Sequence, residues 1–274
     1  MITPATGTGS TQPITAPIPG WYGKLPCLGD FATRRLPREF IEPWDAWLQR
    51  SIAASRRELG DRWLDLFLTS PMWRFALAPG ACGREAWAGL LLPSVDKVGR
   101  YFPLTIAVPL ERCDADLTEV FAAHSWFAEL EKVALSALNV EYTPADLEAA
   151  LAQHPFLSDG WAPAQSAVVE DMASWLESSP ASPRAFVLPR GRSIAAVMDA
   201  TARGMLDART AGRTFWWCIS EETGATETHC SAGLPPESYY TVLLGGARAG
   251  EPIPADPLKA FGFGEPADDA AAAR

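Results

Sequence analysis

Three short apolar segments in the first half of the chain constrain its fold more than any other feature of the sequence. They cover residues 73–78, 85–92 and 102–109. Aromatic and branched apolar residues fill them, and Gly- or Pro-containing connections of hairpin length separate each from the next. We therefore predict three neighbouring strands whose pairing is mostly antiparallel. A further short strand that runs into a turn is predicted at Gly20–Pro26, with a loop after it.

Helical periodicity precedes and follows these strands. Apolar residues that include Trp44 recur at three- and four-residue spacing over 38–58, which predicts a helix. Gly60 is placed like a C-terminal glycine, and Asp61 like the N-cap of a shorter helix that ends before Pro71. The second half adds predicted helices at 117–138, 144–153, 165–177 and 194–207, predicted strands at 184–188, 214–220 and 227–230, and a short helix or turn after residue 236. Helices interleaved with strands predict the α/β class.

The two ends differ in composition from the rest of the 274 residues. Residues 1–19 are rich in Thr, Pro, Gly and Ser, and residues 247–274 are rich in Ala, Pro, Gly and Asp. Such segments bury too little apolar surface to offset the entropy lost on ordering, so we expect a disordered N-terminal segment and a flexible tail. Between them we predict a single α/β domain over 20–246, because the late strands need the early sheet as a partner.

Charge and cysteine usage restrict the partners and the compartment. The chain has 23 basic and 33 acidic side chains, a net charge of −10, which is a poor match for nucleic acid. Its first 110 residues carry +3 and the remainder −13. The N-terminus lacks the pattern of a secretory signal, and no apolar run approaches the roughly 20 residues of a membrane span. Five scattered cysteines without a C-x-x-C pair suit a reducing compartment. We expect a cytoplasmic protein that does not enter membranes.

Motifs for cofactor chemistry are missing from the sequence. It has neither a Walker-type nor a dinucleotide-binding glycine pattern, and no standard zinc or calcium spacing, so we expect no cofactor and no metal. One alternative is a zinc site formed by His229 and Cys230 and completed by Cys218. Joint ligation by His229 and Cys230 is awkward, because adjacent residues of a strand face opposite sides of the sheet. Ser94 and Asp96 leave open a hydrolase that uses a distant histidine, although no G-x-S-x-G surrounds Ser94. The other interpretation is that both are turn residues.

A second open question concerns charged residues at the ends of the predicted strands. Lys24, Asp30, Arg74, Asp96 and Arg100 lie next to Gly, Pro and aromatic residues, where long side chains can converge. They form either a structural ion-pair network or a binding site, and buried charges are usually paired.

The aromatic residues can either pack in the core or form a contact surface. Most tryptophans lie in segments with core periodicity, which predicts packed rings with bonded N–H groups. Trp216 and Trp217 are neighbours in a predicted strand, so Trp217 or its neighbour reaches the outer helical layer or solvent.

Four motifs carry a resemblance to a known family. They read Gly23-Lys24-Leu25-Pro26 with Gly29-Asp30-Phe31, then Pro43-Trp44-Asp45 with Trp47-Leu48, then Pro71 with Trp73-Arg74-Phe75, then Pro93-Ser94-Val95-Asp96 with Val98-Gly99-Arg100 and Phe102-Pro103-Leu104. In this order, over about residues 20–110, they resemble the TagF family of type VI secretion system-associated proteins, also called ImpM. Trp216-Trp217 and Gly233-Leu234-Pro235 resemble its weaker C-terminal part.

The resemblance implies both a fold and a function. The fold is a layered α/β/α sandwich around a mixed, largely antiparallel sheet. The function is post-translational repression of type VI secretion, without catalysis, through binding of the system's forkhead-associated scaffold protein and in connection with a separate kinase and phosphatase. We expect the loops 29–35 and 94–100 to present the partner surface. The candidate partner-binding residues are Lys24, Asp30, Arg34, Arg35, Arg74, Ser94, Asp96, Arg100 and Trp217.

Overall fold

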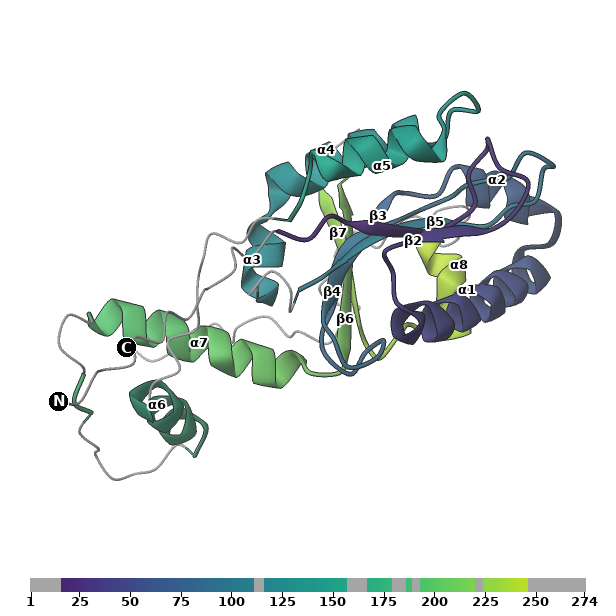
Figure 1. The fold of residues 1–274 in the computed structure, drawn as a ribbon. Coiled ribbons are helices and arrows are strands. Elements are labelled where there is room, and N and C mark those ends of the chain that lie inside the picture. Colours follow the sequence, from purple (N-terminus) through teal and green to yellow (C-terminus); the bar gives the residue numbers. More distant parts are fainter. Residues whose placement is uncertain are drawn as a thin grey trace, which may run out of the picture.

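The fold is built on one seven-stranded sheet with helices on both faces (Figure 1). A computed structural model describes residues 16–110, 116–156, 167–178, 186–188, 193–219 and 224–245. The strands are β1 (Gly20–Gly23), β2 (Ala32–Arg34), β3 (Trp73–Leu77), β4 (Trp87–Leu92), β5 (Leu104–Pro109), β6 (Arg213–Ile219) and β7 (Thr226–Ala232). Their spatial order is β2-β1-β5-β4-β3-β6-β7. Every pairing between these described strands is antiparallel. The layered α/β/α prediction is confirmed, with an antiparallel rather than a mixed sheet.

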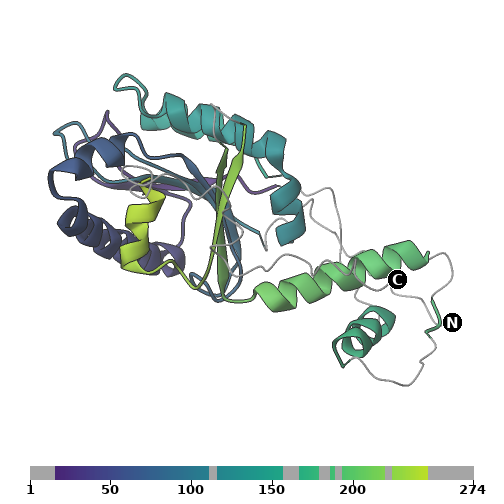
Figure 2. The ribbon, with the colours of Figure 1, turned by 180° about the vertical axis from the view of Figure 1, so that it is seen from behind.

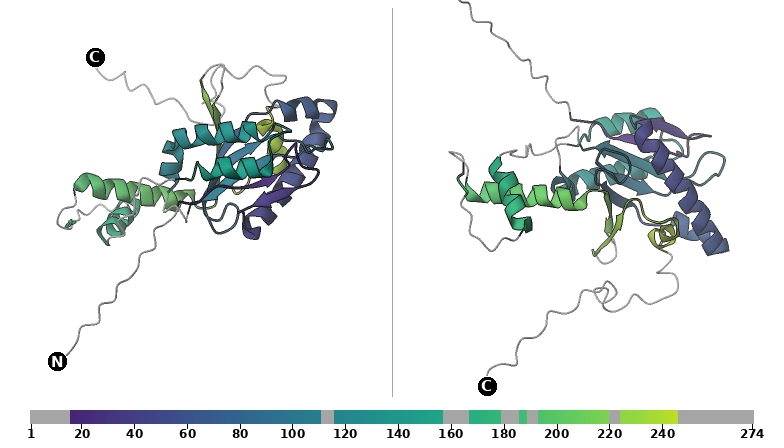
Figure 3. Two further views of the ribbon diagram at one scale, coloured as in Figure 1. Left: turned by 45° about the horizontal axis from the view of Figure 1, so that its top comes forward. Right: turned by 90° about the horizontal axis from the view of Figure 1, so that it is seen from below.

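The helices form two layers and a projecting arm. Their bounds are α1 (Arg38–Leu59), α2 (Trp63–Leu68), α3 (Leu117–Ala122), α4 (His124–Ser136), α5 (Pro144–Ala152), α6 (Ala167–Ser178), α7 (Ile194–Thr210) and α8 (Tyr240–Leu243), with 3₁₀ turns η1 (Gly60–Arg62) and η3 (Glu237–Tyr239). Helices α3 to α5 cover one face of the sheet, and α1, α2 and α8 cover the other (Figures 1 and 2). Helices α6 and α7 extend away from this sandwich in every view (Figure 3).

The central strands are buried on both faces, so their side chains divide between two cores. On β3, Phe75 packs toward α1, whereas the neighbouring Ala76 belongs to the core under α3 and α4. Trp216 packs against Trp44 at 5.8 Å between ring centroids, while Trp217 faces Phe127 of α4 at 5.2 Å. The expectation that this tryptophan pair faces opposite sides is confirmed, and both rings are buried.

Four tryptophans have bonded indole N–H groups, as predicted, whereas the buried Nε1 of Trp175 in α6 has no partner among the described residues. Trp44 donates to Thr105, Trp63 to Ser55, Trp73 to the carbonyl of Leu243, and Trp126 to the carbonyl of His154. An indole that found no acceptor in the core would cost free energy on burial. These bonds therefore fix how the helices and the C-terminal segment sit on the sheet.

The predicted helix 117–138 is broken at Ala123, which has φ −76° and ψ 44°. The break has a packing reason. Phe121 and Phe127 both contact Trp217, at 5.7 and 5.2 Å between ring centroids. Six residues apart on an unbroken helix, the two rings would point about 120° apart, so one continuous helix could not place both there.

Three other predictions differ from the structure. Strand β2 lies within the segment predicted as loop 29–35. Asp61 is no N-cap, because η1 continues the chain into α2. Residues 186–188 of the predicted strand 184–188 are not a strand, and 184–185 lie outside the described residues. Of the predicted terminal segments, only 16–19 are described; there the Pro17 carbonyl accepts from the backbone N–H of Phe156.

Close packing of the sheet predicts the effect of Gly89→Ala in β4. A Cβ at this position lies 2.1 Å from the carbonyl oxygen of Ile106 and 2.8 Å from Phe75 Cζ, so strands or ring must shift. We expect a loss of about 1 to 3 kcal/mol or more in the free energy of unfolding, measured by urea denaturation. Gly204→Ala in α7, where a Cβ meets nothing within 4 Å, is the control and should raise stability by up to about 1 kcal/mol. Equal effects of the two changes would contradict this account of the sheet.

Candidate functional site

Asp96 organises the loop between β4 and β5. Its Oδ1 accepts hydrogen bonds from the backbone N–H groups of Val98 and Arg100, at 3.1 and 2.9 Å. Its Oδ2 accepts from Arg100 Nε at 2.7 Å and from the ammonium of Lys24. Gly99 takes a φ of +84°, which a residue with a side chain rarely adopts. One buried carboxylate therefore fixes the whole turn and presents residues 97–100 outward.

The same loop is fastened to the segment after β1. Ser94 Oγ donates to the Lys24 carbonyl at 2.8 Å, and the Lys97 backbone N–H donates to the Leu28 carbonyl at the same distance. The guanidinium of Arg100 also donates to the carbonyl of Gly29. Loops 24–31 and 94–100 thus form one unit, defined here as the paired-loop surface.

Electrostatics strengthen this arrangement at Asp96. Burial alone would raise the pKa of this carboxyl, since it disfavours the charged form. Hydrogen bonds from Lys24, from the Arg100 backbone and guanidinium, and from the Val98 N–H outweigh burial and hold the pKa of Asp96 well below its usual range. The Asp96 carboxylate is therefore ionised at neutral pH and is paired with two basic side chains, Lys24 and Arg100.

Apolar side chains are exposed on the outer side of the paired-loop surface. Phe31 is 44% exposed and Val98 is 66% exposed. Phe31 is held in place by Tyr22 and Phe102, at 6.0 and 4.8 Å between ring centroids, and Lys24 Nζ lies 4.5 Å from its centroid. Exposed charged residues surround them: Asp30, Lys97 and Arg100. Exposed apolar groups on rigid loops with a charged rim are typical of protein contact surfaces.

The structure brings together only part of the predicted partner-binding set. Lys24, Ser94, Asp96 and Arg100 meet in the paired-loop unit, and Asp30 lies in the same loops with its Oδ1 bonded to the Phe31 N–H. Lys24, Ser94 and Asp96 are buried, so they support the surface from beneath. The ion-pair network considered from the sequence is present here for Lys24, Asp96 and Arg100.

The other candidates lie elsewhere. Arg34 ends β2 and is exposed; Arg35, the next residue, donates to the Pro19 carbonyl at 2.7 Å and pairs with Glu148 of α5. Arg74 is buried and pairs with Glu131 of α4 at 2.6 Å, which fastens that helix to the sheet.

Trp217 lies opposite Arg74 in the strand register and belongs to the same buried layer. Trp217 is 8% exposed and offers little surface to a partner.

The geometry around Ser94 is that of a structural residue. Its hydroxyl donates to a backbone carbonyl, and within the described ranges no histidine is hydrogen-bonded to Ser94 or Asp96. His229 is instead bonded to Tyr239 at 2.7 Å and to Glu227 at 2.9 Å, and burial lowers its pKa. Cys230, its neighbour, is exposed. In the part of the chain that the structure describes, no group of three His, Cys, Asp or Glu side chains is placed to hold a metal ion.

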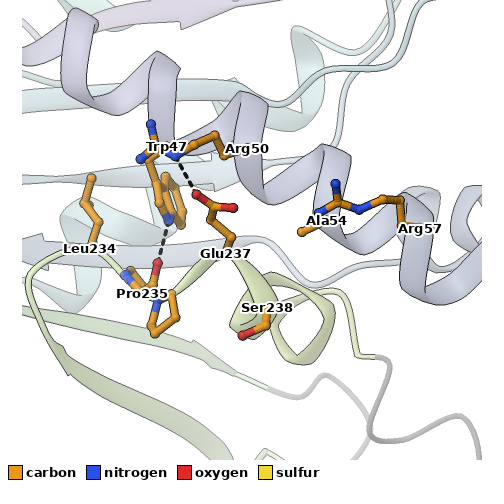
Figure 4. Close-up of a pocket in the computed structure, with 9 residues that line it drawn as sticks. Trp47, Arg50, Ala54, Arg57, Leu234, Pro235, Glu237 and Ser238 are labelled. Carbon is orange, nitrogen blue, oxygen red and sulfur yellow. Dashed lines mark hydrogen bonds and ion pairs between the residues drawn. The ribbon is translucent and has the colours of Figure 1, made fainter.

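A groove of about 570 Å³ lies away from these loops, between α1 and residues 234–238 (Figure 4). Trp47 Nε1 donates to the Pro235 carbonyl at 2.8 Å, and Arg50 pairs with Glu237 at 2.6 Å. None of the candidate residues lines it. Sequence reasoning missed it because its two walls are almost 190 positions apart, and no local pattern links them.

Comparisons with known proteins identify the class. The family described as TagF N-terminal domain, type VI secretion system-associated, matches residues 20–154. The crystal structure of PA0076 from Pseudomonas aeruginosa PAO1 is similar at 37% sequence identity and a TM-score of 0.63, covering 87% of this chain and 98% of that one. No curated protein matches the chain. The paired-loop surface lies wholly within the matched region.

These matches make the chain a type VI secretion system-associated protein with a layered α/β fold. Within that class it belongs to the TagF family, as its four motifs predicted. Among the described residues no helix has the length and apolar character needed to cross a membrane.

Asp96→Asn should lower the melting temperature at neutral pH, because Lys24 is left buried beside a neutral acceptor. The folded-state pKa of Asp96 lies below the unfolded value of about 3.9, so its carboxylate stabilises the fold above pH about 4. That contribution is lost as the pH falls through the folded-state pKa. The difference in melting temperature between wild type and Asp96→Asn, followed by circular dichroism, should therefore shrink under acidic conditions. Asp30→Asn, at an exposed carboxylate, is the matched control. A difference that stays constant from neutral to strongly acidic pH would show that Asp96 does not act through its charge.

Proposed function

We propose that this TagF-family chain is a cytoplasmic, post-translational negative regulator of a type VI secretion system. It acts by binding the forkhead-associated scaffold component and performs no catalysis. A kinase and a phosphatase that modify the scaffold pathway are then separate proteins. Family membership supports the link to type VI secretion, and the resemblance of the motifs supports the scaffold as the partner.

The observation that carries the proposal is the paired-loop surface. It places Phe31 and Val98, both large and exposed, on loops whose backbone is fixed by buried groups. A preordered loop loses little conformational entropy on binding, which favours association. Its rim carries two basic residues, Lys97 and Arg100, against one acidic residue, Asp30, so the matching region of the scaffold should be mainly acidic and binding should weaken with salt.

Surface variants separate binding from folding. Val98→Asp and Lys97→Glu change exposed side chains, and neither side chain takes part in the Asp96 network. Each should weaken binding of the purified scaffold by at least about tenfold in isothermal titration calorimetry, with the melting temperature unchanged. Arg84→Glu is the matched control: Arg84 is exposed on the loop between β3 and β4, at the opposite end of the same sheet. Normal binding by Val98→Asp and Lys97→Glu would exclude the paired-loop surface as the contact.

Ser94→Ala tests the absence of catalysis. We expect repression of secretion to persist, with a loss of about 1 kcal/mol in stability from the missing hydrogen bond to the Lys24 carbonyl. Secretion assays in a strain that carries the variant at its native locus measure the first effect, and thermal unfolding measures the second. Loss of repression by a folded Ser94→Ala protein would revive the hydrolase alternative.

A further inference from the structure

The groove between α1 and residues 234–238 offers two guanidinium groups to an anionic ligand (Figure 4). Arg50 and Arg57 are seven residues apart on α1, so they lie on one side of the helix, about 10 Å apart along its axis. Arg50 pairs with Glu237 through Nε, so its two terminal nitrogens have no partner among the described residues. Arg57 is exposed, and within the described ranges its side chain makes no hydrogen bond or ion pair. With one carboxylate against two guanidinium groups, the groove carries a net positive charge.

The rest of the groove lining is mostly apolar. Trp47 and Ala54 belong to the α1 side, and Leu234, Pro235 and Pro236 form the other side. Grooves of this kind suit extended proline-containing peptides, because such peptides are already stiff and lose little entropy on docking. The basic groups add a requirement for acidic side chains on the peptide.

This chain contains a segment with that chemistry after its last described residue, Gly245. Residues 250–258, defined here as the C-terminal proline segment, read Gly-Glu-Pro-Ile-Pro-Ala-Asp-Pro-Leu. They include three prolines and two acidic residues, and no basic residue. Glu251 and Asp256 are five residues apart, which is about 15 Å in a polyproline conformation. Long arginine side chains can make up the difference of about 5 Å from the spacing of their backbone positions on α1.

We propose that the C-terminal proline segment docks in this groove, with Glu251 beside Arg57 and Asp256 beside Arg50. The segment then runs antiparallel to α1, and its prolines lie against the apolar walls. Two ion pairs across the groove fix its register. The complementarity of charge and of apolar surface between two parts of one chain carries the assignment.

The connection between groove and segment is long enough for this contact. Thr241, in α8, donates to Glu58 at 2.8 Å, so the chain enters its C-terminal segment beside the end of the groove that holds Arg57. Four residues separate Thr241 from Gly245, and six more lead to Glu251. Six extended residues can span up to about 20 Å, which is enough to return the chain to Arg57.

Docking within one chain makes the C-terminal proline segment a built-in competitor for the groove. A tethered segment acts at an effective concentration of about millimolar, so weak contacts are enough to hold it in place. The groove is then closed to acidic peptides of other proteins until the segment is displaced. None of the residues of the paired-loop surface lines the groove, so this inference is independent of the proposed function.

Photocrosslinking of the full chain tests where the segment lies. With a photoreactive benzoylphenylalanine in place of Ile253, mass spectrometry should find crosslinks within one chain to the walls of the groove. Arg57→Glu should lower their yield by at least about fivefold, and Arg57→Glu combined with Glu251→Arg should restore it. Arg84→Glu, at an exposed position in the loop between β3 and β4, is the control and should leave the yield unchanged. Circular dichroism checks that all variants keep their helix content.

Titration of a synthetic peptide with the sequence of residues 250–258 tests the competition. The labelled peptide should bind the full chain carrying Glu251→Lys and Asp256→Lys at least about tenfold more tightly than wild type, because the altered segment no longer fills the groove. Equal affinity for the two chains, measured by fluorescence anisotropy, overturns the proposal. So do crosslinks that map outside the groove or persist in Arg57→Glu. Crosslinks that join two chains also overturn it, since they would assign the groove to the segment of a second copy.

Discussion

Burial of the sheet on both faces is the constraint on which the rest of this structure depends. Strands β3 and β4 expose almost nothing, so each large side chain must be packed by a helix and each buried N–H must find an acceptor. The chain meets this requirement with tryptophans whose rings fill the two cores and whose N–H groups reach a strand, a helix and the C-terminal segment. On the α4 side, Nε and Nη2 of the buried Arg74 bond to Glu131, while its Nη1 has no partner among the described residues.

Asp96 plays a comparable part at the end of the sheet. Through Lys24 and Arg100 its carboxylate joins two loops that are about 70 positions apart. The buried charges thus order a surface whose exposed members are Phe31, Lys97 and Val98. Structural and contact roles fall on different residues of the same loops.

The sequence was a good guide wherever short-range pattern decides structure. The spacing around Trp44 predicted α1, and glycine and proline positions predicted the central hairpins. It failed where distant contacts decide: Ala123 breaks a helical pattern because two phenylalanines share Trp217, and the three residues of β2 pair only because β1 lies beside them. At the site, charged residues were found readily, but Lys24 and Asp96 could not be told from surface groups, since burial depends on the whole fold. Val98 was overlooked as a contact residue because an isolated valine carries no chemical signal.

Hydrogen–deuterium exchange of the chain with and without the purified forkhead-associated scaffold tests the central claim most directly. The account predicts slower exchange on complex formation at residues 28–33 and 97–100, and unchanged exchange in the loop 79–85 at the other end of the sheet. The amides of residues 97–100 are already hydrogen-bonded in the free chain, so their exchange should start slow and become slower still on binding. A stable complex with protection confined to other parts of the chain would contradict the assignment of the paired-loop surface as the regulatory contact.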